Sequence, residues 1–214
     1  MKALIQKHKE HWADRSFSLS VLSGFLFLAL GLVLNYFAGA FANQRASNAV
    51  TDIILDNLPV WQVGVFFVDG AVIFGILVIL ILIQEPKRIP FVVKSVALFV
   101  VIRSFFISLT HLGPSPGMTP LDLNRFLGKL TFGGDLFFSG HTGLPFLLAL
   151  IFWRNFRLRI FFLAASLFFA IITLLGHLHY SIDVFAAFFI TYAIFHLAQW
   201  FFPKDYKLFL GGLK

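Results

Sequence analysis

Long apolar runs, separated by short polar segments, dominate the chain. Six runs approach the roughly 20 residues that a membrane-spanning helix needs, and they lie at about 17–42, 60–83, 91–112, 140–153, 160–176 and 182–202. The pattern predicts an all-α, polytopic membrane protein with six transmembrane helices, in which residues 1–214 form a single membrane-embedded domain. We expect the first run to be a retained helix, because its apolar core is longer than the roughly 7–15 residues of a signal peptide.

Two polar segments carry a helical pattern of their own. In residues 1–15, apolar and aromatic positions recur at helical spacing among basic ones, which fits either a short amphipathic helix on the cytoplasmic membrane surface or a solvated tail. The loop at 113–138 opens with a Gly- and Pro-rich stretch that cannot continue a helix. The Thr119-Pro120 step then predicts a short interfacial helix, which would either cover the entrance to a site or be an ordinary surface helix.

The composition supports the membrane assignment. Hydrophobic residues make up 59% of the chain and charged residues only 13%, with 30 Phe, whereas a soluble domain is about half apolar and a quarter charged. The net charge of +7 would suggest a nucleic-acid partner in a soluble protein. In a membrane protein, Lys and Arg gather at helix ends to set the topology, so no nucleic-acid partner is expected. The chain has no Cys, which excludes thiolate catalysis and Cys metal ligands.

The basic residues also predict the orientation in the membrane. Lys and Arg cluster at the N-terminus, in the loops after the second and fourth runs, and in the C-terminal tail, whereas the opposite side carries Arg45, Arg125 and Lys129. The positive-inside rule therefore predicts that both termini are cytoplasmic. The small size of the chain suggests a bacterial inner-membrane protein, with its outer loops in the periplasm.

The segment between the fifth and sixth runs contains the first candidate for chemistry. His179 and Asp183 are four residues apart, so they share a face if the last helix begins here. A carboxylate in that position can accept the Nδ1 proton of the imidazole. The other nitrogen, Nε2, is then left unprotonated as a nucleophile or base.

A second candidate opens the fourth run, at the same predicted membrane face. Ser139, Gly140 and His141 stand where a helix begins, and helix N-termini bind phosphate through free N–H groups and the macrodipole. Two histidines, an orienting carboxylate and a phosphate cradle are the parts needed for phosphoryl transfer through a phosphohistidine.

Two charged residues fall inside apolar runs. Asp69 and Arg103 are each about nine residues from the outer end of their runs, or about 14 Å deep at the helical rise. A buried charge usually pairs or faces a polar cavity. We therefore expect an Asp69–Arg103 ion pair, an Arg103 phosphate ligand held by Asp69, or both. Thr110, seven residues after Arg103, would extend the same polar side of that helix.

The remaining histidines have less distinctive surroundings. His196 lies deep in the sixth run and is expected to be a core residue, and His177 is expected to pack behind His179. A zinc site built from His141, His177, His179 and Asp183 is an alternative. That alternative leaves the Ser-Gly step and Arg103 without a role, so we expect no metal and no cofactor.

Residues 134–142 (GDLFFSGHT) and 179–184 (HYSIDV) resemble the two signature motifs of the sphingomyelin synthase family, a branch of the type 2 phosphatidic acid phosphatase superfamily. Arg103 followed by 110–114 (THLGP) is similar to a further motif of that family. The family's first, Pro-rich acidic motif is matched only loosely, by Asp52, Asp56 and Pro59. The Ser-Arg step of the phosphatase branch is replaced by Ile172-Thr173, which favours the synthase branch.

The resemblance implies a role for each candidate residue. His179 would be the nucleophile, Asp183 its orienting partner, and His141 the acid that protonates the leaving oxygen and later activates the acceptor. Ser139, Gly140 and Arg103 would bind the phosphate. Independently of the resemblance, we expect Asp69, Thr110, Asp135 and Tyr180 to support the site.

The implied activity is transfer of a phosphate or phospho-head group, such as phosphocholine or phosphoethanolamine, from a phospholipid to ceramide or diacylglycerol at the outer leaflet. One alternative is a lipid phosphate phosphatase, in which water takes the place of the lipid alcohol. A second alternative is a non-enzymatic transporter or channel that uses Asp69 and Arg103. Such a protein would not need His141, His179 and Asp183 together at one membrane face.

Overall fold

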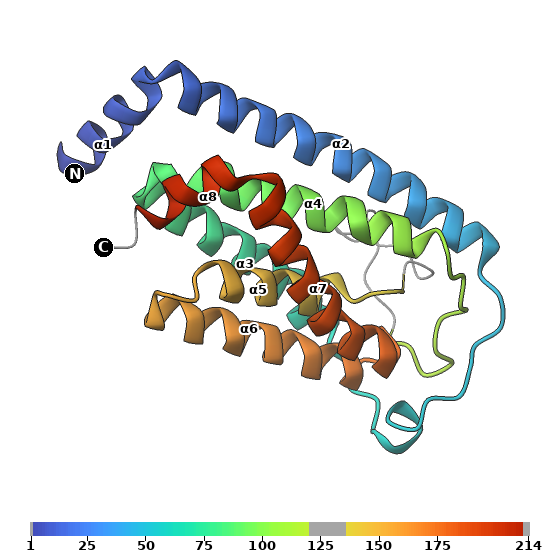
Figure 1. Ribbon diagram of the computed structural model, residues 1–214. Helices are drawn as coiled ribbons and strands as arrows, with labels where there is room; N and C mark the ends of the chain where they lie inside the picture. Colours follow the sequence, from blue (N-terminus) through green and yellow to red (C-terminus); the bar gives the residue numbers. More distant parts are fainter. Residues whose placement is uncertain (1, 120–135, 212–214) are drawn as a thin grey trace.

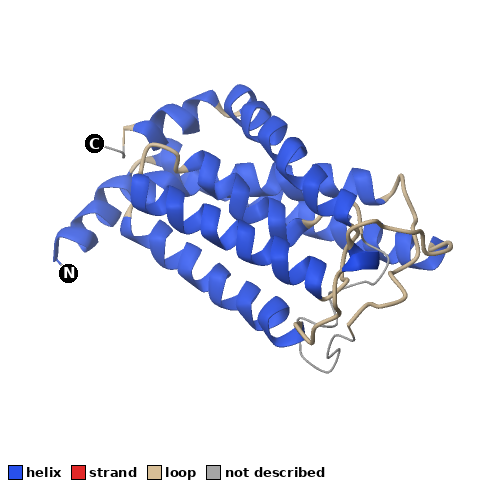
Figure 2. Cartoon of the chain, turned by 90° about the horizontal axis from the view of Figure 1, so that it is seen from below, coloured by secondary structure: helices blue, strands red, loops and turns tan. Residues whose placement is uncertain are grey.

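The computed structural model describes residues 2–119 and 136–211, and all regular structure in these ranges is helical (Figure 1, Figure 2). In chain order the elements are α1 (Lys2–Ala13), α2 (Arg15–Arg45), the 3-10 helix η1 (Leu55–Asn57), α3 (Gly64–Gln84), the 3-10 helix η2 (Pro86–Arg88), α4 (Ile89–Ile107), α5 (Gly140–Ile151), α6 (Phe156–Leu175), α7 (Ser181–Phe201) and α8 (Pro203–Leu210).

Six helices correspond to the six predicted runs. Within the described residues, five segments are long and apolar enough to cross a membrane, namely α2, α3, η2 with α4, α6 and α7, and α5 is a shorter apolar helix. The predicted all-α, polytopic membrane protein is therefore confirmed.

The predicted boundaries differ most, by four or five residues, at the start of α3, the end of α4 and the start of α6. Residues 60–63 stay outside α3 because the Trp61 N–H donates to the carbonyl of Leu175, the last residue of α6, at 2.8 Å. At the end of α4, the Ser108 N–H and hydroxyl both donate to the Ser104 carbonyl, at 3.2 and 2.9 Å, and close the last turn. Beyond Ile107 the chain is loop and bonds to the segment after α2, since the His111 carbonyl accepts the Ser47 N–H at 2.9 Å and the Gly113 N–H donates to the Asn48 carbonyl at 3.2 Å.

Helices also form at both ends of the chain. The sequence left either a short helix or a solvated tail open for the N-terminus, and residues 2–13 form a helix. The location of this helix on a membrane surface stays a prediction. The C-terminal helix α8 was not predicted from the basic tail. It forms because Phe209 is fully buried, with ring centroids 5.8 Å from Phe91 and 5.3 Å from Phe152.

Successive membrane helices alternate in direction, so the chain ends lie together (Figure 1). The connections 46–63 and 108–119 and the loop between α6 and α7 gather at the opposite end, where most of the loop backbone is seen in Figure 2. Helix α2 lies along α4, α5 packs against α6 and α7, and α3 packs chiefly against α6.

Burial separates a central helix from helices at the periphery. In the most apolar window of each, 56% of the residues are buried in α4, against 22% in α2 and 11% in α3. The exposed apolar faces of α2 and α3 are those expected of helices that face lipid. Helix α4 therefore forms the centre of the bundle and can carry polar side chains into it.

One such group lies near the end of the bundle that holds the termini. Lys94 of α4 donates to Asp205 of α8 and to Ser20 of α2, each at 2.7 Å, and Ser20 donates in turn to Asp205 at 2.6 Å. The Lys94 and Asp205 side chains are only 14% and 12% exposed. This triangle ties α2, α4 and α8 together where an isolated charge would be costly.

The interfacial helix expected from Thr119 onward lies outside the described residues. Asp135, Arg125 and Lys129 lie outside them as well. Thr119 itself is buried. Its N–H donates to the Gly176 carbonyl at 2.9 Å and its hydroxyl to the Trp61 carbonyl at 2.8 Å.

Candidate active site

The two histidine-containing segments meet at the end of the bundle opposite the termini. His179 and Asp183 come from the start of α7, and Ser139 and His141 from the start of α5. The Ser139 N–H donates to the Asp183 carbonyl at 3.1 Å, which joins the two segments directly. The sequence prediction that they share one end of the molecule is therefore confirmed.

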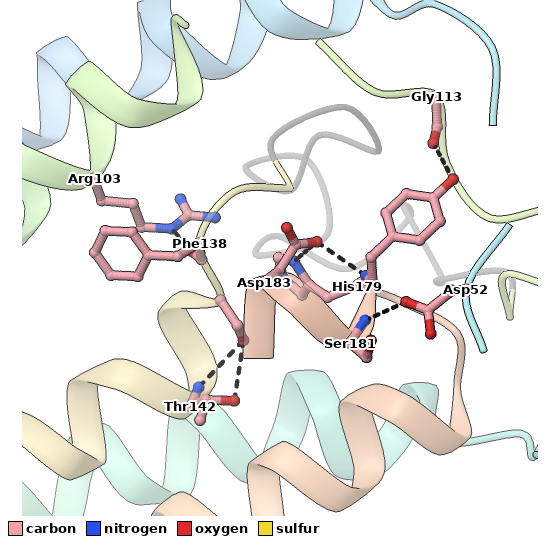
Figure 3. A network of polar contacts seen from close by, with 10 residues as sticks. Asp52, Arg103, Gly113, Phe138, Thr142, His179, Ser181 and Asp183 are labelled. Atoms are coloured by element: carbon pink, nitrogen blue, oxygen red, sulfur yellow. Dashed lines mark hydrogen bonds and ion pairs between the residues drawn. The ribbon is translucent and has the colours of Figure 1, made fainter. Parts of the chain in front are cut away.

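The His179–Asp183 pair forms at the first turn of α7 (Figure 3). The distance between His179 Nδ1 and Asp183 Oδ2 is 3.5 Å, and Asp183 is fully buried. The same Oδ2 accepts the Tyr180 N–H at 2.9 Å, so Asp183 also caps its own helix. Because α7 begins at Ser181, this capping contact, and not a shared helical face, brings the carboxylate to the imidazole.

The separation of 3.5 Å is longer than a charge-assisted hydrogen bond. Catalytic hydrogen bonds are often long in a site without substrate and shorten in the substrate complex. His179 is 7% exposed. The pair can therefore present one imidazole nitrogen to a substrate while the carboxylate holds the other side of the ring.

His177 precedes this pair and turns the chain. Its φ of 52° lies in the left-handed region, which non-glycine residues seldom adopt. The side chain is buried, and a Cβ added to Gly117 would lie 2.9 Å from His177 Nδ1. Gly117 therefore allows the loop 108–119 to pack closely on His177. The expected role of His177 behind His179 fits this position.

The start of α5 forms the second half of the site. Ser139 is the N-cap residue, and its hydroxyl oxygen accepts the Thr142 N–H at 3.4 Å. A Cβ added to Gly140 would lie 3.2 Å from Arg103 Nε. The absence of a side chain at Gly140 therefore lets the α5 N-terminus approach the guanidinium. This close approach places helix N–H donors beside a fixed positive charge.

Arg103 reaches this place from α4. It is buried and donates from Nε to the Phe138 carbonyl at 2.8 Å (Figure 3). It also donates from Nη1 to Asn35 Oδ1 at 3.3 Å. The depth of about 14 Å expected from the sequence assumed a helix that continues to residue 112. Because α4 ends at Ile107, Arg103 is only about 6 Å from the helix end at the helical rise.

The expected Asp69–Arg103 ion pair is absent from the described part of the chain. Asp69 is half-buried near the start of α3, but α3 packs chiefly against α6 and not along α4. The expected helical relation between Arg103 and Thr110 was also wrong, since Thr110 lies beyond the end of α4 and is exposed. A supporting role for Asp69 and Thr110 at the site therefore stays a prediction.

His141 lies in the first turn of α5 and stacks on an aromatic ring that the sequence did not single out. The ring centroids of His141 and Phe67 are 3.7 Å apart at an interplanar angle of 29°, and Phe169 lies at 5.7 Å. Arg103 and His179 are close enough to His141 to interact with it electrostatically. Among 30 Phe, no local signal marks Phe67, because its partner is set by packing between α3 and α5.

A second residue assigned no role in the sequence analysis contacts the start of α7. Asp52 accepts the Ser181 N–H at 2.6 Å from the loop between α2 and α3 (Figure 3). Burial alone would raise the pKa of the Asp52 carboxyl, but hydrogen bonds from the Ser181, Leu55 and Ile54 N–H groups outweigh burial and hold the pKa below its usual value.

The structure also bears on the expected core position of His196 and on the alternative zinc site. His196 is not a core residue. It is exposed on α7, with its ring centroid 4.6 Å from that of Tyr192, because this face of α7 points out of the bundle. Within the described residues, no three His, Asp or Glu side chains gather closely enough to hold a metal ion, so the four candidate zinc ligands are not arranged as a metal centre.

These features define an integral membrane protein with a buried His–Asp pair, a second histidine, an arginine and an open helix N-terminus at one end of its bundle. Residues 133–200 match the family described as PAP2 superfamily C-terminal. The match includes both histidine-containing segments and supports the type 2 phosphatidic acid phosphatase superfamily. No curated protein and no solved structure matches the chain.

Members of this superfamily are phosphatases or phosphotransferases. The match therefore supports an enzyme with lipid phosphatase or phosphotransferase-type activity, acting on lipids in the membrane. It does not extend to Arg103, Asp52 or Phe67, which the fold brings to the same end of the bundle.

Proposed function

We propose that this protein transfers a phospho-head group from a phospholipid to a lipid alcohol through a phosphohistidine, as a sphingomyelin synthase-like enzyme. One observation carries the proposal. The buried His179–Asp183 pair is joined by a backbone hydrogen bond to the N-terminus of α5, beside the guanidinium of Arg103. A nucleophile, its orienting carboxylate and a phosphate cradle thus share one place.

In the first half-reaction, His179 Nε2 attacks the phosphorus and the bond from phosphorus to the diacylglycerol oxygen breaks. His141 donates a proton to that oxygen, so diacylglycerol leaves as an alcohol. In the second half-reaction, the hydroxyl of the acceptor, ceramide or diacylglycerol, attacks the phosphohistidine. His141 takes the hydroxyl proton, the phosphorus–nitrogen bond breaks, and His179 is regenerated.

The charge that develops on the phosphoryl oxygens needs fixed donors. Arg103 supplies a positive charge, and the Gly140 and His141 N–H groups point out of the first turn of α5. Asp183 stabilises the positive charge that His179 acquires as it forms the new bond. No step requires a metal ion or an organic cofactor.

The proposed site faces the outer leaflet, with both termini in the cytoplasm. Helices α5 and α7 begin at the end of the bundle opposite the termini (Figure 1), and the basic residues concentrate at the end with the termini. In a bacterial inner membrane this orientation would direct the site toward the periplasm. Donor and acceptor would then both come from the outer leaflet.

Hydrolysis is the second candidate, favoured by the match to the PAP2 superfamily. Water would then attack the phosphohistidine, with His141 as the base, and phosphate or a phospho-alcohol would be released. The same residues serve both reactions, which differ only in the acceptor that reaches the phosphorus.

The test uses purified protein in lipid nanodiscs with labelled phosphatidylcholine, phosphatidylethanolamine or phosphatidic acid, with and without ceramide. We expect acid-labile label on the protein and a labelled lipid product that requires the lipid alcohol. His179→Ala should lose both, whereas His196→Ala, exposed on the same helix, should retain them. Protein labelling that persists in His179→Ala would overturn the proposal, and phosphate release without lipid product would favour hydrolysis.

A further inference from the structure

We infer that Asp52 is a positioning residue that holds the candidate nucleophile loop in its reactive geometry. This inference rests on the function proposed above. Asp52 is 129 residues from Ser181 in the sequence and belongs to the loop between α2 and α3. Its carboxylate nevertheless contacts the first residue of α7, two positions after His179.

The carboxylate of Asp52 connects two separate segments. Oδ2 accepts the Ser181 N–H at 2.6 Å, while Oδ1 accepts the Ile54 N–H at 2.9 Å and the Leu55 N–H at 3.2 Å. One oxygen therefore holds α7 and the other holds the loop that carries Asp52 itself. This bridge requires both oxygens to be acceptors.

Two carboxylates share the free N–H groups at the start of α7. Asp183 takes the Tyr180 N–H at 2.9 Å and Asp52 takes the Ser181 N–H. Negative charge at a helix N-terminus is also favoured by the helix dipole. Because Asp183 must approach His179 from the same turn, the direction in which residues 177–180 enter α7 sets the distance within the pair. Asp52 fixes that direction from outside the helix.

The same loop contacts the nucleophile segment at further points. The Val50 N–H donates to the Tyr180 hydroxyl at 3.2 Å, and that hydroxyl donates to the Gly113 carbonyl at 2.8 Å. On the other side, the Trp61 N–H donates to the Leu175 carbonyl at 2.8 Å. The segment 50–61 therefore spans the loop from the end of α6 to the start of α7, and Asp52 adds a charged contact at the helix end.

Asp52→Asn separates this role from a general structural one. An amide has a single acceptor oxygen, so it must give up either the Ser181 contact or the Ile54 and Leu55 contacts, and its NH2 group would face an N–H donor. We expect kcat to fall about 10- to 100-fold, the usual effect of loosening a reactive geometry, with KM changed by less than about threefold. Asp52→Glu, which keeps two acceptor oxygens, should recover part of the lost kcat.

Asp56→Asn is the matched control. Asp56 is exposed, lies four residues from Asp52 and accepts the Asp52 N–H at 3.2 Å, a contact that an amide oxygen can also make. This variant should keep kcat within about twofold of the unchanged protein.

Amide hydrogen exchange over residues 176–184 tests the same contact without any assay of activity. Exchange should accelerate in Asp52→Asn and not in Asp56→Asn. Unchanged exchange, a kcat within about twofold of the unchanged protein, or a loss confined to KM would each overturn the inference. If the unchanged protein and His179→Ala are equally inactive on every lipid, the proposed function fails, and the exchange data still decide whether Asp52 holds α7.

Discussion

At the residue scale, the space beside Arg103 exists because residue 140 is a glycine and has no Cβ. Gly140 stands in the first turn of α5, and a Cβ there would lie 3.2 Å from Arg103 Nε. That distance is tighter than ordinary van der Waals contact. A methyl group would have to displace the guanidinium from the helix N-terminus by a few tenths of an ångström, at the place where the phosphate is proposed to bind.

Gly140→Ala should therefore reduce activity more than stability. We expect kcat/KM to fall about tenfold or more, since losing one aligned donor to the transition state costs about 100- to 1000-fold in well-studied cases. The melting temperature should change little, because alanine is a better helix residue than glycine. Steady-state kinetics and thermal unfolding in detergent measure the two effects.

Gly75→Ala is the control for this substitution. A Cβ at Gly75, in the middle of α3, would meet no atom within 4 Å. It should leave kcat/KM unchanged and raise stability by about 0.5–1 kcal/mol. Equal activities in the two alanine variants would show that the approach of Gly140 to Arg103 has no role in the reaction.

The histidines show how far a single residue can be interpreted from its neighbours in sequence. His179 and His141 were recognised because a carboxylate and a Ser-Gly step accompany them. His196, expected in the core, is exposed beside Tyr192, because burial of a polar residue in an apolar run depends on which face of the helix meets the bundle.

At the scale of elements, α8 is held to the bundle by a buried ion pair. Lys94 and Asp205 are 2.7 Å apart and mostly buried, so removing one partner leaves a charge without its counter-ion. We expect Lys94→Met or Asp205→Asn to destabilise the protein by about 3–5 kcal/mol. Thermal unfolding in detergent measures the loss, with Lys204→Met, on the exposed face of α8, as the control.

The double variant completes the cycle. Lys94→Met with Asp205→Asn should be more stable than the worse single variant, since neither charge is then stranded. Strictly additive losses would show that the two residues stabilise the protein independently. The proposed site is at the other end of the bundle, so the surviving folded fraction should keep its kcat.

The loop between α2 and α3 should respond to acid through Asp52. Its folded pKa is lowered from 3.8, so its contribution to stability is present above about pH 4 and is lost as pH falls through the lower folded value. The gap in melting temperature between the unchanged protein and Asp52→Asn should therefore be constant near neutral pH and close in strong acid. A gap that changes between pH 6 and 8 would contradict this assignment.

At the scale of the whole molecule, the absence of Cys allows a direct test of orientation. Asn57→Cys lies at the site end and Arg157→Cys at the end with the termini, and both positions are exposed. In intact cells, a membrane-impermeant thiol reagent should label Asn57→Cys and should label Arg157→Cys only after permeabilisation. The reverse pattern would place the site residues in the cytoplasm and exclude catalysis at the outer leaflet.

The sequence alone determined the helical class, the alternation of helices and the common end of the two histidine segments. In a bilayer every spanning segment must satisfy its own backbone hydrogen bonds, so a long apolar run predicts a helix. Each spanning helix carries the chain to the opposite face, so the number of helices before a loop predicts the face on which that loop lies. His179, Asp183, Ser139 and His141 could be recognised because their partners are near in sequence.

Only the tertiary structure decided which helices are neighbours and which distant residues meet. Membrane helices are apolar on every side, so no amphipathic stripe reveals their contacts. For this reason α3 packs on α6, Asp69 does not pair with Arg103 in the described chain, and Phe67 stacks on His141. Asp52 reaches Ser181 across 129 residues, because loop positions follow from helix packing and leave no local pattern in the sequence.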